Sequence, residues 1–210
     1  MSRRILSTSA SVAGNTVVWW LARSKDVDPS RYDGPTSTAL PPPRDGVSPL
    51  LALGAVGVVL GASALVGRRN APDPSHPGIR RWYRQLEKPD FTPPDAAFGA
   101  VWPVLETGLA VGGYRLLRRP SGTARNSAVG LWLLNTAMVG GWTQLFFREK
   151  RLGASAAVSG TMVATGAAYV VAAAKVDRPA AAAAVPFVAW LGFATFLAER
   201  IWRDNPREDR

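Results

Sequence analysis

Five runs of apolar residues divide this chain, and clusters of charged residues separate them. Each run is about 20 residues long, which is the length that an α-helix needs to cross the hydrocarbon core of a bilayer. None shows the charged face that an alanine-rich helix of a soluble protein would carry. The pattern therefore predicts an all-α integral membrane protein with five transmembrane helices. The runs cover residues 48–67, 96–117, 127–147, 154–174 and 179–202.

A proline pair predicts where the second helix begins. Pro93 and Pro94 stand just before an uncharged run, and proline in the first turn of a helix loses no hydrogen bond. The preceding stretch, residues 81–94, is polar and basic. It includes Trp82 and Tyr83, amphipathic rings of the kind that collect at membrane–water interfaces. We interpret it as an interfacial loop that leads into the second helix.

Pairs of glycines four residues apart occur in the first two runs. Gly57 and Gly61 form one pair, and Gly108 and Gly112 form the other. Small residues at this spacing allow the backbone of a neighbouring helix to approach closely. Both pairs therefore predict helix–helix contacts. Arg68 and Arg69 are expected to end the first helix.

The two ends of the chain differ in composition from its centre. Residues 1–47 are rich in polar residues and proline and are expected to be disordered or poorly ordered. Their start resembles a twin-arginine signal, but the apolar patch at 17–22 is short and interrupted. Residues 48–205 form the predicted membrane domain, and 206–210 form a short tail.

Charge and composition restrict the classes of function. The net charge is +10, but the basic residues flank apolar runs, a pattern typical of contact with anionic lipid rather than nucleic acid. More Lys and Arg residues lie beside the first loop, the third-to-fourth loop and the C-terminus, so these are predicted to be cytoplasmic. Cysteine is absent, and a single histidine, His76, predicts no metal site.

Aromatic and polar residues share one helical face in three of the runs. If these faces converge, they form an aromatic cavity suited to a flat, largely apolar ligand with an acidic edge. Ordinary helix packing is the alternative explanation of such faces. The residues are Trp102 and Glu106 in the second run, Trp132, Asn135, Val139, Trp142 and Phe146 in the third, and Phe187 and Trp190 in the fifth.

Glu106 lies near the middle of the second run, where an ionised carboxylate is costly. A buried acid of this kind indicates a functional group, such as a ligand contact or a proton site. The alternative is a protonated acid that bonds Asn135, Thr136 or a backbone carbonyl and holds two helices together.

Three stretches, in this order, resemble the TspO/translocator-protein family, the tryptophan-rich sensory proteins. They are RWYRQLEKPDFTPPDAAFGAVWPVLE at 81–106, WTQLFF at 142–147 and PFVAWLGFATFLAERIWRDN at 186–205. The resemblance implies a five-helix bundle, commonly a homodimer. It also implies binding of tetrapyrroles such as porphyrin or haem, in a pocket between the helices beneath the first loop. No resident cofactor is expected.

The resemblance also implies which residues line the pocket. Lys88 and the loop arginines are expected to attract anionic propionates. Glu106, Asn135 and Phe187 depart from the family pattern but belong to the same candidate site. Glu199 stands at the tyrosine of the sterol-associated motif, so cholesterol binding is not predicted. The residues that match by motif position are Trp82, Lys88, Pro89, Phe98, Trp102, Trp142 and Trp190.

The function implied is sensing, sequestering or moving a tetrapyrrole, with regulation of tetrapyrrole handling or of a stress response. The sequence contains no conventional catalytic constellation, so we do not predict an enzyme. Light-dependent degradation of bound porphyrin is implied by the resemblance alone. Two other classes stay open: a proton-coupled transporter centred on Glu106, and a structural or interaction membrane protein that binds no ligand.

Overall fold

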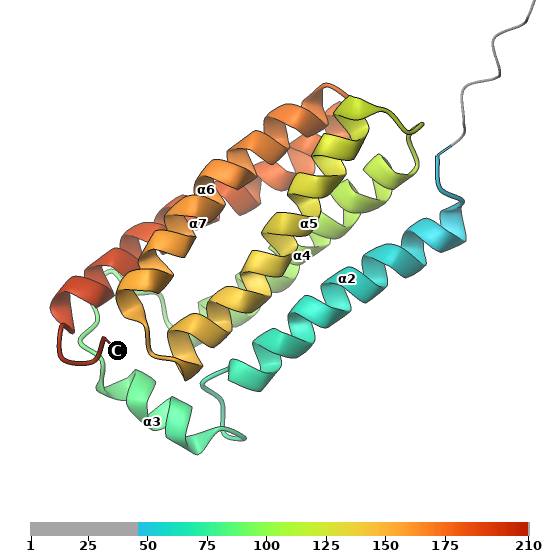
Figure 1. The fold of residues 1–210 in the computed structure, drawn as a ribbon. Helices are drawn as coiled ribbons and strands as arrows, with labels where there is room; N and C mark the ends of the chain where they lie inside the picture. The colour runs from blue at the N-terminus through green and yellow to red at the C-terminus, as the bar shows by residue number, and fades with distance from the viewer. Residues whose placement is uncertain (1–45, 210) are drawn as a thin grey trace, which may run out of the picture. The chain divides into compact units, whose positions relative to one another are not determined.

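The computed structural model describes residues 46–209, and this part of the chain contains helices and no strand. The expectation of disorder for residues 1–47 falls almost wholly outside the described residues and stays a prediction. Figure 1 shows the helices in chain order. They are α2 (Pro49–Asn70), α3 (Pro77–Gln85), α4 (Asp95–Leu117), α5 (Thr123–Thr143), the π-helix η2 (Gln144–Arg148), α6 (Leu152–Ala174) and α7 (Arg178–Asp204).

Four of these helices, α2, α4, α6 and α7, are long and apolar enough to cross a membrane. They correspond to four of the five predicted spans. The third predicted span is divided between α5 and η2, and α5 alone does not reach the same apolar character. The reason is visible in its sequence, because α5 carries Arg125 and Asn126 in its first turn and Asn135 and Thr136 in its middle. The count of five spans is therefore not confirmed.

The start of α4 agrees with the prediction, whereas the end of α2 does not. Helix α4 begins at Asp95, directly after the proline pair, as predicted. Helix α2 does not stop at the two arginines but continues through them to Asn70. Arginine near a helix C-terminus interacts favourably with the helix dipole, and its long side chain can reach the membrane surface. Asn70 then closes the helix, since its Nδ2 donates to the Val66 carbonyl at 3.0 Å.

The interpretation of residues 81–94 as a loop is wrong for its first part. Trp82 and Tyr83 lie on α3, a short helix that begins at Pro77. The Trp82 side chain is buried, whereas Arg80, Arg81 and Arg84 are exposed. Helix α3 is therefore amphipathic, as expected of a helix that lies along a membrane surface.

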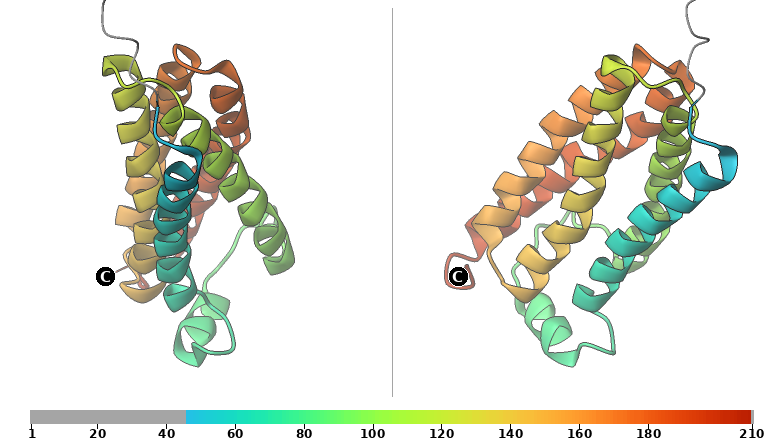
Figure 2. Two further views of the ribbon diagram at one scale, coloured as in Figure 1. Left: turned by 90° about the vertical axis from the view of Figure 1, so that its right-hand side faces the viewer. Right: turned by 45° about the vertical axis from the view of Figure 1, so that its right-hand side comes forward.

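Helices α6 and α7 form the most extensive contact of the bundle, and α4 packs on α7 while α5 packs on α6. Helix α2 contacts both α5 and α4 (Figure 1). The N-terminal end of α4 diverges from α2, as the left view of Figure 2 shows. The buried residues of α4 accordingly begin only at Leu105.

The two glycine pairs behave differently. A methyl group at Gly108 would overlap the Ala183 carbonyl oxygen, and one at Gly112 would overlap the Tyr169 hydroxyl. This pair therefore allows α4 to approach α7 and α6, as predicted. Gly57 and Gly61 have no described atom within 4 Å of the corresponding positions, so no helix of the described chain uses that pair.

Asp177, the residue before α7, ties α7 to the C-terminal end of α4. Its carboxylate accepts hydrogen bonds from Arg115 Nε at 2.8 Å, Arg119 Nε at 2.9 Å and the Ala180 amide at 2.9 Å. The Asp177 side chain is 1% exposed, whereas the two arginine side chains are 38% and 48% exposed. Burial of the carboxyl acts to raise its pKa, but these hydrogen bonds outweigh burial and lower the pKa to about 2.

Candidate ligand-binding site

The aromatic face predicted for the third run points into the bundle. Trp132, Asn135, Val139 and Phe146 are buried, and Trp142 is partly buried. The helical spacing therefore identified the inner face of α5 correctly. The hydrogen bonds of these side chains decide which of them remain available to a ligand.

Both polar atoms of the Asn135 side chain form hydrogen bonds within the protein. Its Nδ2 donates to the Leu131 carbonyl at 2.8 Å, and its Oδ1 accepts a hydrogen bond from Thr165 Oγ1 at 3.0 Å. Thr136 Oγ1 likewise donates to the Trp132 carbonyl at 2.9 Å. The bond to Thr165 makes Asn135 a link between α5 and α6.

Trp190 has a polar group that is fully buried and unsatisfied. Its ring meets that of Phe98 edge to face, with centroids 5.8 Å apart and planes at 74°. The indole Nε1 is buried and has no hydrogen-bond partner among the described residues. Buried donors are nearly always paired, because an unpaired one costs about 1–3 kcal/mol. A ligand acceptor at this position would therefore be bound favourably.

Trp102 and Glu106 lie one turn apart on α4 and are both partly buried. Trp102 packs against the same core cluster as Trp190. Glu106 has no hydrogen-bond partner in the described part of the chain, so the alternative in which it bonds Asn135 or Thr136 is not observed. The structure thus leaves a carboxyl group in the middle of α4 available to a ligand or a proton.

Trp142 contributes a ring rather than a hydrogen bond to the site. Its Nε1 donates to the Ser155 carbonyl at 3.0 Å, and its ring stacks on Phe146 with centroids 4.8 Å apart. Phe187 is 0% exposed and belongs to the core. These two aromatic residues therefore support the site through packing.

Two hollows lie at the outside of the bundle, and neither includes Trp102 or Trp190. The first, of about 430 Å³, lies between α5, η2 and α6, and Trp142 forms part of its wall. The second, of about 440 Å³, lies between α2 and α5 and is lined by small and apolar residues such as Ser63 and Gly140. Neither of these two hollows is the predicted central cavity, which stays a prediction.

The residues predicted to cap the site have partners of their own. Trp82 Nε1 donates to Glu208 Oε2 at 2.9 Å. Lys88 Nζ lies 4.3 Å from the centre of the Tyr83 ring and donates to the Tyr83 carbonyl. Burial lowers the pKa of Lys88. The carbonyl of Pro89 accepts hydrogen bonds from Thr92 within a turn. Lys88 is therefore held against α3. Its contact with propionates stays a prediction.

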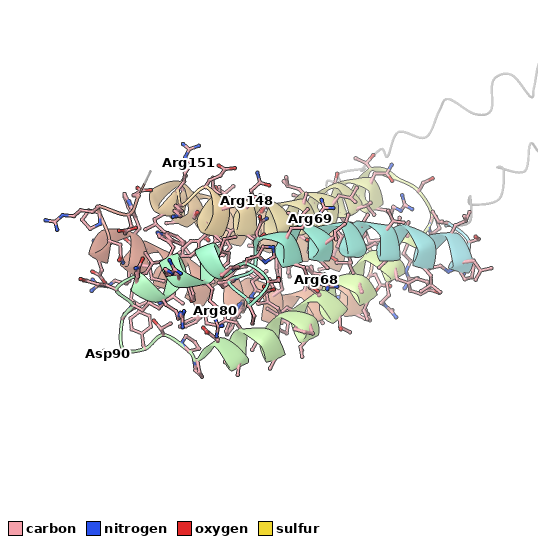
Figure 3. The ribbon with its side chains drawn as sticks, turned by 90° about the horizontal axis from the view of Figure 1, so that it is seen from below. Arg68, Arg69, Arg80, Asp90, Arg148 and Arg151 are labelled. Carbon is pink, nitrogen blue, oxygen red and sulfur yellow. The ribbon has the colours of Figure 1, made fainter. Side chains whose placement is uncertain are left out.

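Arginines at the same end of the bundle supply positive charge instead. Figure 3 shows the side chains of five of them, with Asp90 on the loop between α3 and α4. All five are exposed, and none forms an ion pair within residues 46–209. Exposed guanidinium groups attract phosphates and carboxylates. The five are Arg68, Arg69, Arg80, Arg148 and Arg151.

Two residues that organise this structure were missed in the sequence. Asp177 could have been found, because Asp followed by Pro179 two residues later is a helix-start signal. Asn205 follows the last apolar run, but nothing local indicates that it bonds to the Glu87 backbone, at 2.8 Å to both its N–H and its C=O. Contacts between residues so far apart in the chain depend on the fold.

These observations define a class: a multi-pass helical membrane protein in which aromatic side chains of α4, α5 and α7 pack in one cluster. Comparison with known proteins gives the family. Residues 54–203 match the model of the TspO/MBR family. The chain belongs to this family.

Relatives of the chain occur in animals and in bacteria. The human translocator protein is 33% identical over 131 residues, which cover 60% of this chain and 75% of that protein. Protein CrtK of Rhodobacter capsulatus is 29% identical over 132 residues, covering 60% and 80%. The tryptophan-rich protein TspO of Bacillus cereus is 27% identical over 126 residues, covering 60% and 82%.

Proposed function

We propose that this protein binds a tetrapyrrole, a porphyrin or haem, among the inner faces of α4, α5 and α7, and that it senses, sequesters or transports that ligand. The observation that carries the proposal is the buried, unpartnered Nε1 of Trp190 beside Phe98. Trp102 supplies a second indole, and the Glu106 carboxyl can accept hydrogen bonds from ring nitrogens. A flat aromatic ligand suits walls of this kind.

The proposal includes five membrane spans, with α5 and η2 forming the third. The bond between Trp82 and Glu208 brings the C-terminus to the end of the bundle that carries α3. A chain that leaves this end and returns to it must cross an even number of times. Helices α4, α6 and α7 supply three crossings, which supports α5 as the fourth. Its polar residues Asn135 and Thr136 face inward, so they do not prevent insertion.

Orientation and assembly follow from charge and from the family. We place α3 and the C-terminus in the cytoplasm, because Lys and Arg concentrate at that end. We expect a homodimer, and the open face at Gly57 and Gly61 offers a surface for close helix packing. Binding rather than catalysis is the proposed activity. Tetrapyrrole handling or a stress response is the process it would regulate.

Replacing Trp190 by alanine is expected to weaken protoporphyrin IX binding at least tenfold, about 1.4 kcal/mol, through loss of a ring contact and a donor. The measurement is saturation of tryptophan quenching in the detergent-purified protein. Val185→Ala is the control, because Val185 also lies on α7 but is 52% exposed and belongs to neither the site nor the chain end. If the folded Trp190 variant bound protoporphyrin IX as tightly as the wild type, Trp190 would not belong to the binding site.

A proton-coupled transporter is the second candidate, and the unpartnered Glu106 favours it. If Glu106 carries a proton during transport, ligand flux into liposomes driven by a pH gradient should fall at least tenfold in Glu106→Gln, because glutamine cannot exchange a proton. Binding of protoporphyrin IX should change much less in the same variant. Flux that persists in Glu106→Gln at the wild-type rate would exclude this mechanism.

A further inference from the structure

The residues that follow α7 fold back onto the end of the bundle. Asn205 to Asp209 form a turn, in which the Glu208 amide donates to the Asn205 carbonyl at 3.1 Å. We call residues 205–209 the C-terminal clasp, because each of its polar side chains described below bonds to another element. The loop between α3 and α4, residues 86–94, is called the capping loop.

Asn205 holds the backbone of the capping loop at two points. Its Oδ1 accepts a hydrogen bond from the Glu87 amide at 2.8 Å, and its Nδ2 donates to the Glu87 carbonyl at 2.8 Å. Nδ2 also donates to the Ile201 carbonyl at 2.8 Å, which fixes the amide on the end of α7. Asn205 is only 6% exposed. One buried side chain thus satisfies both backbone groups of a loop residue more than a hundred positions away.

Two acidic residues of the clasp bond to indole groups. Glu208 Oε2 accepts from Trp82 Nε1 at 2.9 Å, which ties the clasp to α3. Asp209 Oδ2 accepts from Trp202 Nε1 at 2.8 Å, and its Oδ1 accepts from the Gly153 amide at 3.3 Å. The clasp therefore joins α3, the start of α6 and the end of α7.

The capping loop has further anchors. Leu86 is buried at its start, and Lys88 is held against Tyr83 of α3. The anchor in its second half lies on α7. Phe91 stacks on Phe196, with centroids 5.2 Å apart and planes at 19°, and meets Phe193 edge to face at 6.4 Å. Phe91 remains 44% exposed, so this contact alone is weak. Release of Asn205 would leave the start of the loop held by Leu86 and Lys88, and its second half held mainly by this exposed ring.

We infer that the C-terminal clasp positions the capping loop over the end of the bundle, and that ligand enters and leaves the candidate site when the clasp releases the loop. Asn205 is the main positioning residue. The ligand part of this inference rests on the proposed function, whereas the positioning of the loop does not. The physical basis is that a few local hydrogen bonds can open without disturbing the packing of α4 to α7.

Hydrogen exchange of the full-length, ligand-free protein in detergent tests the positioning. In Asn205→Ala, amide exchange of residues 86–94 should accelerate roughly tenfold or more, because the Glu87 amide loses a buried acceptor. Exchange in α4 to α7 should stay unchanged. Arg207→Ala is the matched control, because Arg207 lies in the same turn, is exposed and makes no contact described here.

Glu208 variants test the contact of the clasp with α3. Glu208→Ala should accelerate amide exchange of α3. Glu208→Gln, which keeps an acceptor for Trp82, should restore the slow exchange of the wild type.

Stopped-flow quenching by protoporphyrin IX tests the role in ligand exchange. Association and dissociation in Asn205→Ala should both accelerate several-fold, with a smaller change in Kd, because an opened cap lowers the barrier in both directions. A purely structural role would reduce the amount of folded protein and its Tm without changing both rates in the folded fraction.

The outcomes separate the two levels of the inference. Local acceleration of exchange together with faster binding and release supports it. Unchanged exchange, or acceleration spread over all helices, overturns the positioning role. Local acceleration with unchanged ligand rates overturns the capping loop as the gate. Local acceleration in a protein that does not bind protoporphyrin IX upholds the clasp and contradicts the proposed ligand instead.

Discussion

Replacing Asp177 by alanine is expected to lower the free energy of unfolding by about 3 kcal/mol. The substitution removes the partner of two arginines and the cap of α7 at once. Breaking a buried ion pair costs about 3–5 kcal/mol, and loss of a cap costs about 1 kcal/mol. Because Arg115 and Arg119 are partly exposed and water can solvate them, the total should fall at the low end. Unfolding in mixed SDS micelles, followed by circular dichroism, measures it.

The pH dependence of the free energy of unfolding gives a second, independent test of the role of Asp177. The pKa of Asp177 is lowered from 3.8 to about 2 on folding, so its contribution is complete above about pH 4. This contribution to the free energy of unfolding is on the order of 2 kcal/mol, and it is lost as the pH falls from about 4 to 2. Asp177→Asn should lack this loss, whereas Arg178→Ala, next to it, should behave as wild type. A wild-type acid profile that Asp177→Asn reproduces would contradict the assignment.

Gly108→Ala is expected to destabilise the bundle by about 2 kcal/mol. The added methyl group would overlap the Ala183 carbonyl oxygen, which belongs to the backbone of α7 and cannot turn aside as a side chain would. Overpacking of this kind costs typically 1–3 kcal/mol, and here it lies at the upper end. The better helix propensity of alanine offsets up to about 1 kcal/mol of the cost.

Gly57→Ala is the matched control for the glycine substitution. Gly57 also lies inside a membrane helix and begins a pair at the same spacing, but no described atom lies within 4 Å of its Cβ position. The monomer should therefore keep or slightly increase its stability. Equal losses in both variants, measured in the same mixed micelles, would mean that glycine flexibility rather than close packing matters.

The long helices were predictable because their evidence is local. An uncharged run of membrane length fixes a helix wherever it occurs, and the proline pair fixed the start of α4 to within one residue. Helix α3 was not predictable, since it is nine residues long and its apolar side is formed by few residues. The change to a π-helix at Gln144 depends on neighbouring packing rather than on a local signal.

The candidate site was predictable in its faces but not in its hydrogen bonds. Helical period placed Trp132 and Phe146 on the inner face of α5, because that property depends on spacing alone. The partner of Asn135 is Thr165, on another helix, and the partner of Lys88 is the backbone of Tyr83. Which polar groups are already satisfied can be known only once the helices are placed.

The uneven packing of α4 would allow its N-terminal half to tilt while its C-terminal half stays fixed. Near its C-terminal end it is fixed by the close approach at Gly108 and Gly112 and by the bonds to Asp177, whereas its N-terminal end stands apart from α2. Phe98 lies about 15 Å along the helix from Gly108, at 1.5 Å per residue. A tilt of about 5° around that glycine would therefore move Phe98 by roughly 1.3 Å, which widens the aromatic site while the opposite end stays closed.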